Sequence, residues 1–269
     1  MFQTLLRFSV PVLYLFSILT VLLTAQVSGY THFLKTMTQE NGIFESLSVL
    51  WLFSIFLYGS ISLYTHKKIL NTLLILLIGM MSLLALLAAL EEISWGQHLF
   101  HSQSNEYFMQ NNLQKETNIH NLMNANLFSS IIYASIYTLF VFIPLLYKTF
   151  LSHITYLRYF DINLHYILII LFSSTLQIYF YDDFGVYTDM TAHIFALAFF
   201  AYVAFKNKST LVLKIHYLTI LITTGIFMSQ YQVFDFFNMQ YEMREMFVTL
   251  AVLLMFIEFI QKETKLISH

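Results

Sequence analysis

The sequence predicts an all-α integral membrane protein, a polytopic bundle of about eight transmembrane helices forming a single domain over residues 1–269. Of its residues, 58% are hydrophobic and only 10% are charged, and the mean hydropathy is +0.68. Soluble domains carry about 25% charged residues, so this chain cannot cover a water-facing surface. Its apolar runs are about 20 residues long and do not alternate with polar residues, which favours helices over a β-barrel.

Eight apolar stretches follow one another along the chain, and each is a candidate membrane span. They lie near 8–28, 43–64, 69–91, 126–147, 163–181, 190–205, 211–229 and 245–261. The first follows Arg7 and has the form of a signal peptide as well, but we expect it to stay as an uncleaved span. The only two prolines, Pro11 and Pro144, are expected near span ends, where the missing backbone donor costs least.

The basic residues orient this arrangement. Ten of the 13 fall on one side of the eight-span topology, and the positive-inside rule makes that side cytoplasmic, together with both termini. The ten are Arg7, Lys67, Lys68, Lys148, Arg158, Lys206, Lys208, Lys214, Lys262 and Lys265. The outer side carries three basic and twelve of the 15 acidic residues, a formal charge of −9. Depletion of lysine and arginine is one explanation of this bias, and an outer cation or metal site is the other.

Several kinds of chemistry are excluded by what the chain does not contain. There is no cysteine, so disulfides, thiolate metal sites and cysteine nucleophiles are absent. The net charge of −2 predicts no nucleic-acid partner. The sequence also contains no glycine-rich phosphate loop, no G-x-S-x-G motif and no H-E-x-x-H motif.

The first polar segment on the predicted outer side is residues 91–98, EEISWGQH, directly after an apolar run. Ionisable groups at a membrane boundary usually face a partner or a water-filled cavity. If the helix continues, Glu91 and His98 lie seven residues apart on one face. The alternative is that Gly96 ends the helix and turns the chain.

Two further outer segments pair a carboxylate with a histidine four residues later, Glu116 with His120 and Asp189 with His193. On a helix, each pair shares a face, which suits joint metal ligation. Oxygen and imidazole ligands without thiolates suit zinc, manganese or non-haem iron. Local loop pairing of Glu116 and a favourable first-turn position for Asp189 are the ordinary structural explanations.

We therefore predict a divalent metal site on the outer face. Its predicted metal ligands are Glu116, His120, Asp189, His193 and His98. The predicted catalytic residues are Glu91 and Glu92, either of which could serve as a ligand or as the general base for a metal-bound water.

Weaker signals come from other charged residues. Glu45 lies just inside the second apolar run, where it either joins the same cluster or snorkels to the boundary. Arg244 stands between two acidic residues before the last span and is a candidate counter-ion to the acidic face. Glu258 and Lys262, at i and i+4, are expected to form a routine helix ion pair.

The E-E-x-S-W-G-Q segment at 91–97 and the N-x-Q-x-E-x-N-x-H-N segment at 112–121 resemble a signature of uncharacterised bacterial multi-pass membrane proteins. That resemblance implies a bacterial membrane location and no specific activity. The chain is also remotely similar to intramembrane metal hydrolases of the alkaline ceramidase-like superfamily. The similarity is remote because residues 255–261, in the last predicted span, lack the paired histidines expected of that superfamily.

The leading functional prediction is a metal-dependent, hydrolase-like enzyme of the inner membrane, with its site facing the periplasm or exterior. Its partners are membrane lipids and a lipid or lipid-linked substrate, and its oligomeric state is left open. One alternative is a cation or proton transporter or channel with an acidic outer vestibule. The other is a structural or partner-binding membrane subunit, whose polar clusters lock loops to helix ends.

Overall fold

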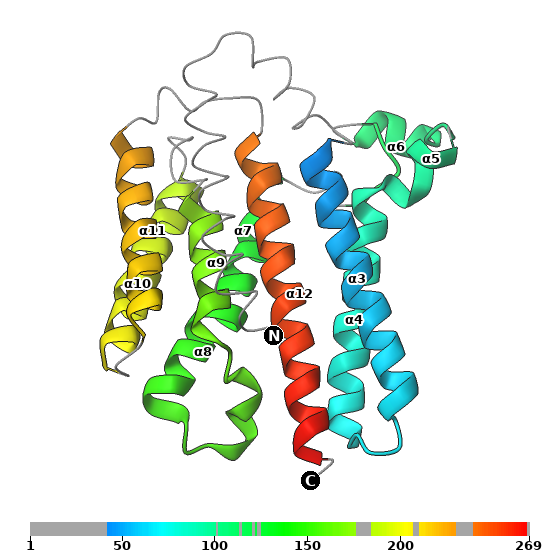
Figure 1. Ribbon diagram of the computed structural model, residues 1–269. Helices are drawn as coiled ribbons and strands as arrows, with labels where there is room; N and C mark the ends of the chain where they lie inside the picture. Colours follow the sequence, from blue (N-terminus) through cyan, green and yellow to red (C-terminus); the bar gives the residue numbers. More distant parts are fainter. Residues whose placement is uncertain are drawn as a thin grey trace.

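The computed structural model describes residues 42–100, 102–112, 115–119, 122, 125–175, 184–206, 210–229 and 239–267, and the regular structure in these ranges is entirely helical (Figure 1). The first predicted span, near 8–28, lies outside them. Helices α3 (Ile43–His66) and α4 (Thr72–Glu92) form an antiparallel hairpin. The turn between them ends at Asn71, whose side chain caps α4 by accepting a 2.9 Å hydrogen bond from the Leu74 amide.

The next span is one continuous helical stretch with two wide turns. It consists of α7 (Ala125–Tyr137), a π-helical segment over Thr138–Phe142, α8 (Ile143–Leu146) and a second π-helical segment over Tyr147–Leu151. The sequence predicted Pro144 near the end of its span, but it lies inside this continuous helical stretch. The π-helical turns on both sides change the hydrogen-bond register around a residue that has no amide hydrogen to donate.

The remaining long helices are α9 (Leu164–Thr175), α10 (Phe184–Lys206), α11 (Leu211–Ser229) and α12 (Met239–Ile267). Every side chain of residues 166–175 is buried, so α9 is a central helix of the bundle. Helix α12 packs against α9 on one side and against α3 on the other, and thereby joins the two parts of the bundle (Figure 1).

Three helical stretches are long and apolar enough to cross a membrane, Ile43–His66, Thr72–Glu92 and Ile131–Leu151. Many of their large apolar side chains are exposed in the isolated chain, as expected where lipid is the neighbour. The all-α membrane-protein fold is thus confirmed. The seven predicted apolar stretches from residue 43 onward each coincide with a helix, while the eight-span count and the location of the termini stay predictions.

Two ends of the bundle matter for function. At the Glu92 end, where α4 ends and α3 and α12 begin, lie the short helices α5 (Gln97–Phe100) and α6 (Glu106–Asn111) (Figure 1). At the opposite end, the Lys262 end, the 3-10 helix η5 (Thr155–Phe160) precedes α9 and faces the last turns of α12.

Gly59 allows α3 to approach both of its neighbours closely. A Cβ atom at this position would overlap the Ser82 hydroxyl of α4 and lie 3.0 Å from the Phe256 ring of α12. The close contact fixes the spacing of the three helices that carry acidic residues at the Glu92 end.

Candidate functional site

The chain makes a left-handed turn where α4 ends, in the 3-10 segment η1 (Ser94–Gly96). The φ angles are 47° at Ser94, 55° at Trp95 and 83° at Gly96. The left-handed region costs a residue with a Cβ roughly 1–2 kcal/mol, so two such residues in succession need support from their surroundings. A Cβ at Gly96 would also lie 3.0 Å from the Phe100 ring.

Two carboxylates hold this turn. Glu91 accepts a 2.7 Å hydrogen bond from the Trp95 indole and another 2.7 Å bond from the Ile119 amide. Glu116 accepts hydrogen bonds from the Ser94 hydroxyl and, at 3.2 Å, from the Asn118 side-chain amide. The acceptor atoms of both carboxylates are therefore directed at the loop.

A second layer of hydrogen bonds connects the same loop to α5. The Gln97 side-chain oxygen accepts bonds from the Thr117 amide at 2.8 Å and from the Ser104 hydroxyl at 3.0 Å. The buried Asn112 side chain donates to Asn118 at 2.8 Å. The polar residues of the two signature segments thus bind each other across about 20 positions of sequence.

Residues 91–98 do not form one continuous helix, and residues 115–119 are not helical, whereas Asp189 and His193 both lie in helix α10. Helix α4 ends at Glu92, four residues before Gly96, and a left-handed turn that includes Gly96 separates Glu91 from His98. Residues 115–119 are not helical, and Lys115 has a φ of 60°, because local hydrogen bonds from asparagine and serine side chains replace a helical ladder.

The structure leaves the metal ligands themselves as predictions. His120 lies outside the described residues, as do the side chains of His98 and Asp189, whose backbones lie in α5 and α10. Among the residues that the structure describes, no group of three or more histidine or acidic side chains is arranged to hold a metal ion.

A separate polar centre forms where α3, α4 and α12 meet at the Glu92 end. The charge of Glu92 is within electrostatic range of Glu245, Glu45 and Glu242. Glu45 comes from the first turn of α3, and Glu242 and Glu245 lie one turn apart on α12. These four residues are called the carboxylate cluster below, and the charge of Glu91 also acts on Glu92.

Arg244 is the cation beside this cluster. Its side chain is only 2% exposed, and the guanidinium carbon lies 3.1 Å from the centroid of the Tyr133 ring of α7. Its charge acts on Glu245 on one side and on His193 on the other. The sequence predicted a counter-ion role for Arg244, and its electrostatic contact with Glu245 agrees with that role.

His193 and Tyr137 form a buried polar contact between α10 and α7. The His193 side chain is buried in α10, and its Nδ1 atom lies 2.9 Å from the hydroxyl oxygen of Tyr137 in α7. Within the described part of the chain, the Nε2 atom has no hydrogen-bond partner. Tyr133 and Tyr137 are four residues apart on one helix face and were not identified from the sequence.

The Lys262 end carries an ionic network. Asp161 lies 2.5 Å from the Lys148 amine and 2.7 Å from that of Lys262, and Arg158 pairs with Glu263 at 3.1 Å. The i, i+4 spacing predicted an ion pair between Lys262 and Glu258. In the structure, Lys262 pairs with Asp161 instead. Burial by itself would raise the pKa of Asp161, but the two lysines outweigh burial and hold it below its ordinary value of 3.8.

The network predicts acid sensitivity. Because the pKa of Asp161 is lowered by folding, its stabilising contribution is complete above pH 3.8 and is lost as the pH falls through the lower folded-state value. The carboxylate is 39% exposed, so we expect a loss under about 1 kcal/mol. Unfolding of detergent-solubilised protein between about pH 2 and pH 5, a range that extends below the unfolded-state pKa, measures it. Asp161→Asn should flatten this part of the profile, and an unchanged profile would contradict the assignment.

Comparisons of this chain with family models, with curated proteins and with solved structures gave no match, so the resemblance to bacterial membrane proteins stays a prediction that rests on the residues quoted for it.

Proposed function

We propose that this protein takes up protons at the carboxylate cluster, and that it works as a cation- or proton-coupled carrier of the bacterial inner membrane. The observation that carries the proposal is that the charge of Glu92 in α4 interacts with acidic residues of α3 and α12, and that the buried guanidinium of Arg244 acts on one of them, Glu245. The positive-inside rule places the basic Lys262 end in the cytoplasm and the cluster on the periplasmic side.

Charge balance is the physical reason. If all four carboxylates were ionised, they and Arg244 together would carry a formal charge of −3 among apolar helices. Like charges repel strongly where the dielectric constant is low, so uptake of protons would relieve the repulsion. Ionisable groups in such positions commonly mark proton or ion pathways.

Helix α12 is the element through which binding would act. It contributes Glu242 and Glu245 to the cluster, and it also contributes Lys262 to the network with Asp161 at the other end. Loading the cluster changes the attraction between α12 and the α3–α4 hairpin. A shift of α12 would therefore change side-chain contacts at both ends of the bundle.

A metal-dependent, hydrolase-like enzyme acting on a lipid or lipid-linked substrate is the second candidate. The buried Nε2 atom of His193 favours it, because an imidazole nitrogen without a hydrogen bond is available to a Lewis acid. In this proposal zinc, manganese or iron is held by His193 with Asp189, His120, His98 and Glu116.

Flux into proteoliposomes tests the carrier. Wild-type protein should move protons, Na⁺ or K⁺ when a membrane potential is imposed, and Glu92→Gln and Glu245→Gln should abolish most of that flux. Glu106→Gln is the matched control, because Glu106 is exposed on α6 and is not among the carboxylates whose charge acts on Glu92. Absence of flux for all three cations in the wild type would contradict transport.

Metal analysis of the same purified protein separates the second candidate from the first. A stoichiometric metal that is lost in His193→Ala supports the enzyme. Wild-type protein without bound metal, or a metal content unchanged in that variant, contradicts it.

A further inference from the structure

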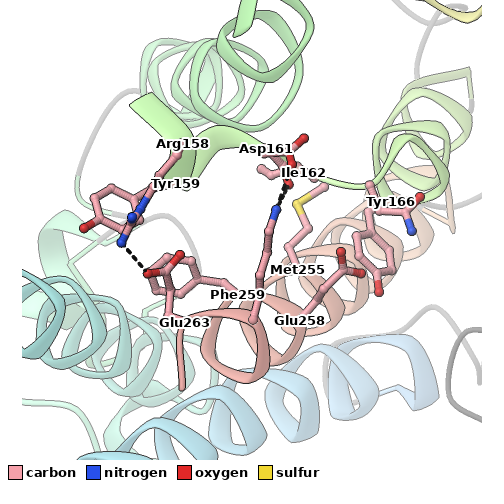
Figure 2. A pocket seen from close by; sticks show the side chains of 11 residues that line it. Arg158, Tyr159, Asp161, Ile162, Tyr166, Met255, Glu258, Phe259 and Glu263 are labelled. Atoms are coloured by element: carbon pink, nitrogen blue, oxygen red, sulfur yellow. Dashed lines mark hydrogen bonds and ion pairs between the residues drawn. The ribbon is translucent and has the colours of Figure 1, made fainter. Parts of the chain in front are cut away.

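A narrow pocket opens at the Lys262 end between η5, the start of α9 and the last turns of α12 (Figure 2). Its volume is about 20 Å³, enough for about one water-sized group. A wider hollow of about 330 Å³ lies next to this pocket. The two share four lining residues, Asp161, Asn163, Glu258 and Lys262. Neither belongs to the centre at the Glu92 end.

Three acidic side chains line the narrow pocket, and only two of them are in ion pairs. Glu263 binds Arg158, as a dashed line in Figure 2 shows, and Asp161 binds Lys262. Since Lys262 turns toward Asp161, the carboxylate of Glu258 has no ion-pair partner within the described part of the chain. It faces the pocket as an anionic acceptor.

Tyr166 is the second polar group directed at this position. The side chain is 1% exposed, and its hydroxyl faces the Glu258 carboxylate (Figure 2). The two groups interact electrostatically, but the geometry falls short of a regular hydrogen bond. A small cation with N–H donors would bind the carboxylate and the tyrosine oxygen together.

The space available selects the kind of cation. A primary ammonium group is about the size of a water molecule and fits the narrow pocket, whereas a trimethylammonium group does not. The wider hollow next to it presents the amines of Lys148 and Lys262. Each amine has three donors, and the contact with Asp161 leaves donors for a second anion such as a phosphate.

The pocket also lies where lipid headgroups are expected. Tyr156 in η5 is 84% exposed and Phe150 is 56% exposed, and exposed aromatic side chains near the end of a spanning helix are typical of the membrane interface.

We infer that the pocket at the Lys262 end binds a phosphoethanolamine group, with the ammonium at Glu258 and Tyr166 and the phosphate at Lys148 and Lys262. The group belongs either to phosphatidylethanolamine in the adjacent leaflet or to a soluble phosphoethanolamine compound. The inference is independent of cation binding at the carboxylate cluster.

Thermal unfolding of delipidated protein in detergent tests it, with phosphatidylethanolamine, phosphatidylcholine or phosphatidylglycerol added. Phosphatidylethanolamine should raise the melting temperature of the wild type most, because it alone offers a primary ammonium and a phosphate. Glu258→Gln should bind it about tenfold more weakly or worse, as expected for loss of a charge-assisted bond. The exposed control Glu106→Gln should respond like the wild type.

Equal stabilisation by phosphatidylcholine or phosphatidylglycerol would overturn the inference, as would an undiminished response in Glu258→Gln. If that variant does not fold, Tyr166→Phe replaces it, and it too must weaken the preference. Soluble O-phosphoethanolamine distinguishes the two sources: a response equal to that of the lipid supports a soluble ligand, and a response to the lipid alone supports a headgroup site.

Discussion

Replacing Arg244 with alanine is expected to lower the free energy of unfolding by about 3–5 kcal/mol, the cost of removing one partner from a buried charged group. The guanidinium is the cation that acts on Glu245, and its flat face covers the Tyr133 ring. Without it the carboxylate cluster keeps its negative charges, and the ring loses its contact. Denaturation of the protein in bicelles or mixed micelles measures the effect.

Two further variants make the result specific. Arg158→Ala removes an arginine that is 43% exposed in its ion pair with Glu263, and we expect a loss below about 1 kcal/mol. Arg244→Lys keeps the charge but lacks the planar group that stacks on an aromatic ring, so its stability should be intermediate. If Arg244→Ala and Arg158→Ala are equally mild, Arg244 does not balance the cluster.

The helices were predictable because the bilayer sets their length. An uninterrupted apolar run of about 20 residues has few alternatives to a helix, and α3 and α4 begin and end within a few residues of the predicted spans. The position of Arg244 near the acidic residues followed from the same reasoning. Its ring partner did not, because contact with Tyr133 depends on how α7 is rotated toward α12, which hydropathy does not determine.

The spacing of Glu116 and His120 suits a helical geometry in the loop after α4, and local backbone structure explains why residues 115–119 are not helical. A spacing of four residues between Glu116 and His120 indicates a shared face only within a helix, and Lys115 is in the left-handed region instead. Asn112 and Asn118, on either side of Glu116, were the available signal, since asparagine side chains compete for backbone groups and favour loops. The pairing of Lys262 is a different case, because its partner Asp161 lies about 100 residues away.

Replacing Glu116 with alanine is the second substitution expected to have a large effect, a loss of about 2–4 kcal/mol. Ser94 and Asn118 are fully buried and both donate to this carboxylate. Each donor left without its acceptor costs roughly 1–3 kcal/mol, although Asn118 keeps its bond to the Ser94 hydroxyl. Unfolding measurements under the same conditions as for Arg244 give the magnitude.

Glu116→Gln separates the acceptor from the charge. The glutamine side chain keeps one oxygen for Ser94 and should recover most of the lost stability if hydrogen bonding is the reason. Trp95 provides a local signal, because its left-handed conformation depends on this network and its indole is bound to Glu91. We expect its fluorescence to shift in Glu116→Ala at temperatures where the helices remain intact.

The same pair of variants decides between the two roles of Glu116. A loop-locking carboxylate can be replaced by an amide with little change, whereas an amide is a poor substitute for a carboxylate metal ligand. Metal bound to the wild type and lost in Glu116→Gln, with stability otherwise retained, would assign the residue to the predicted metal site. Retained stability without any change in metal content would assign it to the support of the left-handed turn.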